Sequence, residues 1–259
     1  MKKVFLIIFV LSFLLIIYLY FSQTKQNNKS LDNEAENTNI NLKPTISKVE
    51  DSSTFFDYNT SQITLTDSSV VKIFSNLDTK LTSKDAMNKY NCNSLINGGF
   101  YTKDNKHVGL FISEGVTLSN SISHNLFNGY LSITSQGKID ITNYPKINSY
   151  FSIQSGPLLI YNQNELKLNL ESDKNARRII SFTTTLNEQH FMVIYDKNSP
   201  LNGPKLSELP KLLNKLENQN SFIIEDAINL DGGSHSALLS NDLKLSEISP
   251  LGSFICITN

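Results

Sequence analysis

Ala227-Ile228-Asn229-Leu230-Asp231-Gly232-Gly233-Ser234-His235-Ser236 is the stretch from which the fold and the function of this chain can best be predicted. Its apolar first half, preceded by Phe222 to Ile224, is typical of a buried strand. Side chains alternate along a strand, so Asn229 and Asp231 should point to one face and Leu230 to the other. The two glycines permit a sharp turn and let a ligand come close. The stretch therefore predicts a carboxylate delivered at a strand end, although Asp-Gly is also common in plain hairpin turns.

The N-terminal residues 1–21 predict a membrane anchor. Val4 to Phe21 is almost unbroken in its apolar character, which is long enough to span a bilayer as a helix. Lys2 and Lys3 precede it and favour a cytoplasmic N-terminus. A cleaved signal peptide, which would give a secreted protein, is the alternative, but no small-x-small cleavage site follows the apolar run. We expect the remainder of the chain to lie outside the cytoplasm.

Residues 22–53 are rich in Asn, Lys, Glu, Ser and Thr, a composition that predicts a disordered polar linker. Residues 54–259 are long enough for one domain with a sizeable core. The net charge is −1, which offers no basic footprint for nucleic acid. Cys92 and Cys256 could form one disulfide, but their separation in sequence says nothing about whether they meet.

The domain reads as α+β, a mainly antiparallel sheet packed with a few helices. Short apolar and β-branched runs predict strands, and leucines at helical spacing predict a main helix over 206–217. Ser83 to Tyr90 predicts a shorter helix with Ser83 as its N-cap. The expected strands are 61–65, 70–74, 108–115, 129–133, 139–141, 151–154, 158–161, 179–183, 191–195, 222–230 and 254–257.

Three further segments combine with this stretch, and the first of them repeats its pattern of a polar side chain before a glycine bend. They are Asn97-Gly98-Gly99-Phe100-Tyr101 followed by Val108-Gly109-Leu110, then Gln154-Ser155-Gly156-Pro157, then Arg177 before an apolar strand. Together with Asn229 to Gly233, and in this order, they resemble the phosphodiester glycosidase family, and the Gln-Ser-Gly-Pro form is closer to its small bacterial branch. The resemblance covers roughly Asn97 to Ser236.

The resemblance implies hydrolysis of the anomeric C–O bond of a sugar-1-phosphodiester, such as an envelope glycopolymer. Such chemistry needs carboxylates beside an oxocarbenium-like centre, for which Asp231 is the first candidate and Asp196 the second. Arg177 would grip the phosphate, because a guanidinium binds two phosphate oxygens at once. The remaining candidate residues would contact the sugar or phosphate: Asn97, Gly98, Gly99, Gln154, Ser155, Asn229, Gly232, Gly233 and Ser234.

Two departures from the family pattern leave alternatives open. Ser181 stands where the family often has glycine, and His235 is a residue that the pattern does not contain. His235 is either a general acid peculiar to this subgroup or an ordinary surface residue. A non-catalytic carbohydrate- or phosphate-binding module on the same fold is the competing function. No cofactor is required by these residues, no metal spacing is present, and a divalent cation held by Asp231 or Asp196 stays open.

Overall fold

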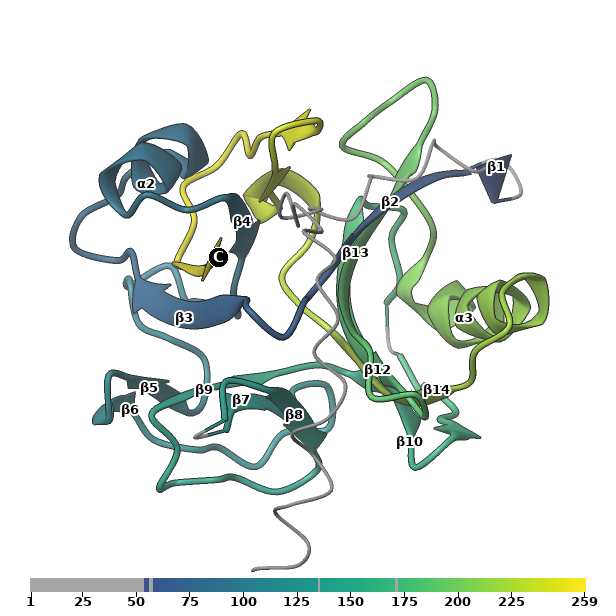
Figure 1. Cartoon of the computed structure of the whole chain (residues 1–259), viewed down its shortest axis with the longest axis horizontal. Helices are drawn as coiled ribbons and strands as arrows, with labels where there is room; N and C mark the ends of the chain where they lie inside the picture. Colours follow the sequence, from purple (N-terminus) through teal and green to yellow (C-terminus); the bar gives the residue numbers. More distant parts are fainter. Residues whose placement is uncertain (1–53, 56–57, 135, 171) are drawn as a thin grey trace, which may run out of the picture. The chain divides into compact units, whose positions relative to one another are not determined.

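Antiparallel strands make up most of the fold (Figure 1). The computed structural model describes residues 54–55, 58–134, 136–170 and 172–259, which belong to one compact unit spanning 47–259. Among these residues no helix has the length and apolar character needed to cross a membrane. The predicted anchor at 1–21 and the predicted linker at 22–53 lie outside the described residues.

The largest sheet of the described residues has seven strands, all paired antiparallel. Its spatial order is β1 (Thr54–Phe55), β2 (Tyr58–Thr64), β13 (Gln189–Asp196), β12 (Arg178–Thr184), β14 (Ile224–Asn229), β10 (Leu158–Tyr161) and β11 (Asn164–Glu165).

Two five-stranded antiparallel sheets complete the described part of the chain. One has the order β16 (Lys244–Leu245), β15 (Leu238–Leu239), β4 (Ser94–Asn97), β17 (Ser253–Thr258) and β3 (Val70–Ser75). The other has the order β6 (Val116–Ser119), β5 (Phe111–Ser113), β9 (Phe151–Ser155), β7 (Gly129–Ile133) and β8 (Ile139–Thr142).

The three sheets share one apolar core, to which strands of each sheet contribute, for example Ile73, Ile153 and Ile179. Helix α3 (Leu209–Gln219) covers the other face of the seven-stranded sheet, and α2 (Ser83–Lys89) packs on the sheet that contains β4 (Figure 1). Leucines at helical spacing bury one side of α3, as an amphipathic helix requires. The sheets and helices thus pack through their apolar faces.

The structure confirms the α+β prediction in its antiparallel strands and packed helices, and it corrects several details. The strands form three sheets rather than one, because apolar periodicity does not say which strands pair. Thr82, not Ser83, is the N-cap of α2, and its hydroxyl accepts the Asp85 N–H. Asn97 ends β4, which pairs with β15 and β17.

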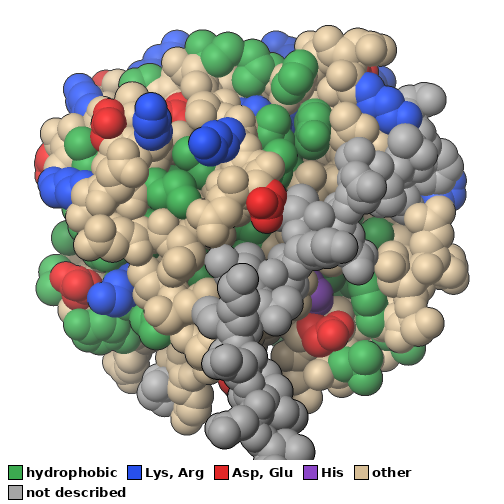
Figure 2. Space-filling model, turned by 45° about the horizontal axis from the view of Figure 1, so that its top comes forward, with side chains coloured by type: hydrophobic (Ala, Val, Ile, Leu, Met, Phe, Trp, Pro, Cys, Tyr) green, Lys and Arg blue, Asp and Glu red, His purple; other side chains and the backbone are tan. Residues whose placement is uncertain are grey.

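Charged side chains are interspersed on the face shown in Figure 2, where blue Lys and Arg lie among red Asp and Glu. This pattern agrees with the net charge of −1. Non-specific binding to nucleic acid draws on clustered positive charge, and the described residues on this face present no such cluster. The absence of a nucleic-acid partner stays a prediction.

Cys92 and Cys256 form a disulfide, with Cα atoms 5.4 Å apart. The bond joins the segment before β4 to the last strand, β17, and both side chains are buried beside α2. It closes a loop of 164 residues in sequence separation, so it restricts the unfolded chain strongly.

We expect Cys92→Ser/Cys256→Ser to lower the free energy of unfolding by about 2–5 kcal/mol relative to the oxidised protein. Urea unfolding followed by circular dichroism measures this difference. The unmodified protein treated with a reductant is the control, and it should unfold with the double variant. Equal midpoints for the oxidised protein and the double variant would show that the bond adds nothing.

Candidate active site

The side chain of Asn97 joins the end of β4 to the end of β14. Its Nδ2 donates to the carbonyl oxygens of Asp231, at 2.8 Å, and of Gly98, at 3.2 Å. Its Oδ1 accepts the Ala237 N–H at 2.9 Å, and the Asp231 N–H donates to the Gly98 carbonyl at 3.3 Å. The backbone at Asp231 is therefore held on both sides of its Cα by the Asn97-Gly98 segment.

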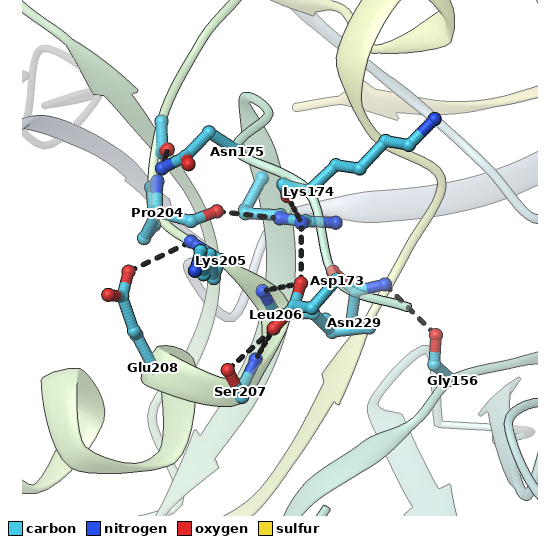
Figure 3. Close-up of polar contacts among 12 residues, drawn as sticks. Gly156, Asp173, Lys174, Asn175, Pro204, Lys205, Leu206, Ser207, Glu208 and Asn229 are labelled. Atoms are coloured by element: carbon cyan, nitrogen blue, oxygen red, sulfur yellow. Dashed lines mark hydrogen bonds and ion pairs between the residues drawn. The ribbon is translucent and has the colours of Figure 1, made fainter. Parts of the chain in front are cut away.

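A second connection ties β14 to the break between β9 and β10. The Ser155 hydroxyl and the Gly156 N–H both donate to the Asn229 carbonyl, at 2.8 and 3.0 Å. In return Asn229 donates its Nδ2 to the Gly156 carbonyl at 2.9 Å (Figure 3) and its N–H to the Pro157 carbonyl at 3.1 Å. At this break the chain passes from one sheet to another, and Asn229 fixes the crossing.

The third motif residue, Gln154, holds a loop in place. Its Oε1 accepts the N–H groups of Leu110 and Ile122, both at 3.0 Å. Its Nε2 donates to the carbonyls of Ile122 and Phe127, both at 2.7 Å. Gly109 leaves room for this side chain, because a Cβ there would lie 2.2 Å from Gln154 Oε1.

These polar side chains, predicted to contact substrate, are seen to bond to the backbone. Asn97, Gln154 and Asn229 are each 2% exposed, and Ser155 is fully buried. Buried amides and hydroxyls require hydrogen-bond partners, and backbone groups supply most of them here; Asn229 Oδ1 has no partner among the described residues. Their observed role is to hold three chain segments together, and any contact with a substrate stays a prediction.

We expect Gln154→Glu to lower the free energy of unfolding by about 2 kcal/mol or more, because two buried carbonyls lose their donor and a carboxylate is placed in the interior. Chemical denaturation measures the change. The exposed Gln136→Glu is the control and should be close to neutral. Stability equal to that of the unmodified protein would argue against a holding role for Gln154.

Asp231 is the half-buried carboxylate of this junction. One of its oxygens accepts the Gly232 N–H at 2.8 Å. Burial raises the pKa of Asp231 to about 7, although the Gly232 hydrogen bond acts in the opposite direction. Burial raises the pKa of the Tyr101 hydroxyl, and the nearby charge of Asp231 raises it further. Near neutral pH Asp231 can therefore exist in both protonation states, as acid–base chemistry requires.

The raised pKa has a consequence for stability. A carboxyl whose pKa is higher in the folded state than its ordinary 3.8 favours folding when protonated. This contribution is present below about pH 4 and is lost as the pH rises through about 7. We expect Asp231→Asn, which cannot ionise, to raise the melting temperature relative to the unmodified protein at pH 8 more than at pH 4. A difference independent of pH would contradict the raised pKa.

Close packing explains the glycines around Asp231. A Cβ on Gly232 would lie 2.8 Å from the Arg177 carbonyl oxygen, and one on Gly98 would lie 2.4 Å from Ser253 Oγ. Gly233 has a φ of +61°, which favours glycine. The Gly99 position is tighter than usual, with a Cβ 3.2 Å from the Gln154 carbonyl. Their predicted contact with phosphate stays a prediction.

Arg177 is 1% exposed and anchors the turn after Asp231. Its Nε donates to Ser236 Oγ at 2.7 Å, and its Nη2 donates to the carbonyls of Ser236 and, at 2.8 Å, Ser246. Burial lowers the pKa of Arg177 to about 10, partly offset by the charge of Glu247, so the group is cationic at neutral pH. The structure shows Arg177 as a positioning residue, and its grip on phosphate stays a prediction.

Arg178 begins β12 and lies on the face of the seven-stranded sheet that α3 covers, as do Ile180 and Phe182. It donates to the carbonyls of Pro204, at 3.1 Å, and Lys174, at 2.5 Å. Asp173 accepts the N–H groups of Leu206 and Ser207 at the start of the helical segment, and it lies 3.7 Å from Arg178 Nη2 (Figure 3). Arg178 therefore joins the loop before β12 to the segment before α3.

Asp196 and Asp231 are not joined by any hydrogen bond among the described residues. Asp196 Oδ1 accepts the N–H groups of Asn198 and Ser199, at 2.7 and 3.1 Å, as the cap of a turn. Met192 and Ile194 pack toward α3, so alternation along β13 places Asp196 on that face as well. Its role as a second catalytic carboxylate stays a prediction.

Residues outside the predicted set also build the site. Segment 246–253 holds it from one side: the N–H groups of Ile248 and Ser249 both donate to the Ser234 carbonyl at 2.9 Å. The Tyr101 hydroxyl donates to the Pro250 carbonyl at 2.7 Å. Tyr101 could have been found from its place after the two glycines of the first motif. Segment 246–253 carries no signal of its own in the sequence.

A cavity of about 650 Å³ lies away from this junction. Its lining includes Thr183 to Thr185 and Asp226, at the ends of β12 and β14 that are far from the turn after Asp231. Asp140 on β8 and Gln189 on β13 also line it. Cavity size alone would have pointed to a different part of the molecule, and the convergence of motifs is the better guide to the site.

Comparisons with known proteins bear on the fold and the family. No curated protein matches the sequence. A hypothetical protein from Synechocystis is 13% identical with a TM-score of 0.61, and the match covers 77% of this chain and 59% of the other. The catalytic domain of zebrafish N-acetylglucosamine-1-phosphodiester alpha-N-acetylglucosaminidase, auto-inhibited by its pro-peptide, is 15% identical with a TM-score of 0.59, covering 78% and 76%.

At these identities the structures show a shared fold. The sequence profile of one family, described as phosphodiester glycosidase, matches residues 90–257, which contain the Asn97, Gln154, Arg177 and Asp231 motifs. This chain therefore belongs to the phosphodiester glycosidase family, and it is an enzyme of that class.

Proposed function

We propose that this chain hydrolyses the anomeric C–O bond of sugar-1-phosphodiesters outside the cytoplasm, with Asp231 as the carboxylate at the anomeric carbon. The observation that carries the proposal is the position of Asp231: a half-buried carboxylate at the point where the Asn97 and Asn229 segments meet, with its pKa raised to about 7. Among the predicted carboxylates, Asp231 is held by the family motifs and Asp196 is not.

The chemistry fits one well-placed carboxylate. Glycosyl transfer passes through an oxocarbenium-like centre, which an adjacent carboxylate stabilises. The leaving phosphomonoester is already a weak base, so it needs less protonation than an ordinary alcohol. Arg177 is cationic and lies behind the turn that follows Asp231, where its charge favours an anion at the site. Fixed charges of this kind act without reorganisation during the reaction.

The proposed location rests on two features of the chain. Residues 1–21 form the apolar segment expected of a membrane anchor. The Cys92–Cys256 disulfide is of the kind that persists in oxidising compartments and is rare in the cytosol. An anchored enzyme facing outward would meet envelope glycopolymers, whose sugar-phosphate linkages belong to the proposed substrate class.

The first test uses residues 54–259 with UDP-N-acetylglucosamine and a panel of α-sugar-1-phosphate diesters, and follows the release of free sugar. We expect Asp231→Asn to lower the rate by at least about 100-fold, because the neutral amide cannot stabilise positive charge. Asp242→Asn, which changes an exposed carboxylate, should keep the rate. Equal release by Asp231→Asn and the unmodified protein would remove Asp231 from the site.

Two further outcomes separate the alternatives. In oxygen-18 water, cleavage at the anomeric carbon places the label in the sugar, whereas cleavage at phosphorus places it in the phosphate. Sugar phosphates that bind without being cleaved would favour the non-catalytic binding module.

We further propose that hydrolysis needs no metal ion. Among the residues that the structure describes, no group of three His, Cys, Asp or Glu side chains is placed to hold one. Dialysis against EDTA should leave sugar release unchanged. A loss of activity that Mg²⁺ or Ca²⁺ restores would contradict this expectation and assign a cation to Asp231 or Asp196.

A further inference from the structure

The turn that follows Asp231 carries a histidine whose ring faces Tyr101. The ring centroids of Tyr101 and His235 are 5.5 Å apart, and the planes meet edge to face at 82°. Both side chains are half-buried, as is Asp231. Edge-to-face contacts of this kind fix the relative orientation of two rings. His235 is thus held against Tyr101, the residue whose hydroxyl also lies within reach of the Asp231 charge.

Segment 246–253 fixes both partners of this ring pair. The Tyr101 hydroxyl donates to the Pro250 carbonyl at 2.7 Å. The ring lies against Gly252, where a Cβ would come within 2.4 Å of Tyr101 Cδ1. On the other side, the Ser234 carbonyl accepts two N–H groups of the same segment. Both rings are therefore positioned by one stretch of backbone.

The two ring nitrogens of His235 differ. Nδ1 lies 3.3 Å from Ser234 Oγ, while Nε2 has no hydrogen bond among the described residues. Burial lowers the pKa of His235 from its ordinary 6.5, so the neutral imidazole prevails at neutral pH. In the tautomer whose Nδ1–H donates a hydrogen bond to Ser234 Oγ, Nε2 is unprotonated and presents a lone pair.

We propose that His235 Nε2 accepts the proton of the water that attacks the anomeric carbon, and that Tyr101 is the positioning residue for this imidazole. The proposal rests on the proposed function and adds a second group to Asp231. The water O–H bond breaks and its proton moves to Nε2, while the water oxygen bonds to the anomeric carbon. The bond from that carbon to the phosphate oxygen breaks, and its electron pair leaves with the phosphomonoester. His235 then releases the proton to solvent.

The ionisable groups near His235 in the described part of the chain are few. Tyr101 faces the ring directly, and Asp231 lies at the start of the same turn. Glu247, on segment 246–253, is engaged with the Ser83 N–H at 2.7 Å. The reaction as proposed needs Asp231 ionised and His235 neutral. Acid protonates both groups, and each protonation should lower the rate.

The test compares His235→Asn with the unmodified protein on the substrate that the panel identifies. We expect kcat to fall by about 100-fold or more. In the acid range below the pKa values of both groups, the plot of log kcat/KM against pH should have a slope near two for the unmodified protein and near one for His235→Asn. Azide, which attacks without losing a proton, should restore turnover of the variant severalfold and yield the glycosyl azide.

His124→Asn is the matched control. His124 is an exposed loop residue whose Nδ1 accepts the N–H groups of Leu126 and Phe127, and an asparagine oxygen can accept the same bonds. It should keep the rate and the slope. Tyr101→Phe preserves the ring contact and should retain more activity than Tyr101→Leu, whose behaviour should approach that of His235→Asn.

The outcomes separate the two proposals. If the unmodified protein cleaves the panel, Asp231→Asn is inactive, and His235→Asn keeps both its rate and a slope of two, the role of His235 is overturned while the proposed function stands. If His235→Asn loses activity but azide restores nothing and the slope is unchanged, His235 is structural only. If the unmodified protein cleaves no member of the panel, both proposals fall together.

Discussion

The structure depends on the amide of Asn97, which carries hydrogen bonds from the end of one sheet to the end of another. Two of its three partners, the Asp231 carbonyl and the Ala237 N–H, lie on either side of the turn that Asp231 opens, and the third is the Gly98 carbonyl. A buried amide that loses such partners costs the desolvation of every group left unpaired. Strands from separate sheets are thereby brought to one junction, and the carboxylate is placed relative to all of them.

The same junction holds a carboxylate in a partly buried position that disfavours its ionised form. Burial raises the pKa of Asp231 to about 7, so its ionised form is destabilising to the fold. Residues of this kind concentrate at functional sites, because catalysis needs groups whose pKa lies near the working pH. Arg177, Ser236 and segment 246–253 supply the rigid backbone that keeps the carboxylate in this setting.

Much of the fold could be predicted from the sequence, since apolar runs and leucine spacing mark strands such as β12 and the helix α3. The pairing of strands could not, because β9 and β10 are neighbours in sequence but belong to different sheets. The Cys92–Cys256 disulfide could not be predicted for the same reason, because two cysteines 164 residues apart in sequence need not lie close together in the fold. Short strands such as β15 and β16 carry too few residues for periodicity to detect.

The candidate site shows a different limit of sequence reasoning. The motifs that carry Asn97, Gln154 and Asn229 were recognised, yet an amide that binds sugar and an amide that binds backbone look alike in sequence. Only burial distinguishes them, and these residues are 2% exposed. The contact between Tyr101 and His235 could not be predicted, because periodicity reports on neighbouring residues and these two are far apart in the sequence.

The central claim is that the Asp231 carboxylate is the reactive group of the site. Carbon-13 NMR of the aspartate carboxyl groups, assigned with Asp231→Asn, tests it most directly when it is recorded across pH with and without a phosphonate analogue of a sugar-1-phosphodiester. We expect a resonance from Asp231 that titrates near pH 7 and changes when the analogue is added. Titration of Asp231 near pH 4, with no response to the analogue, would contradict it.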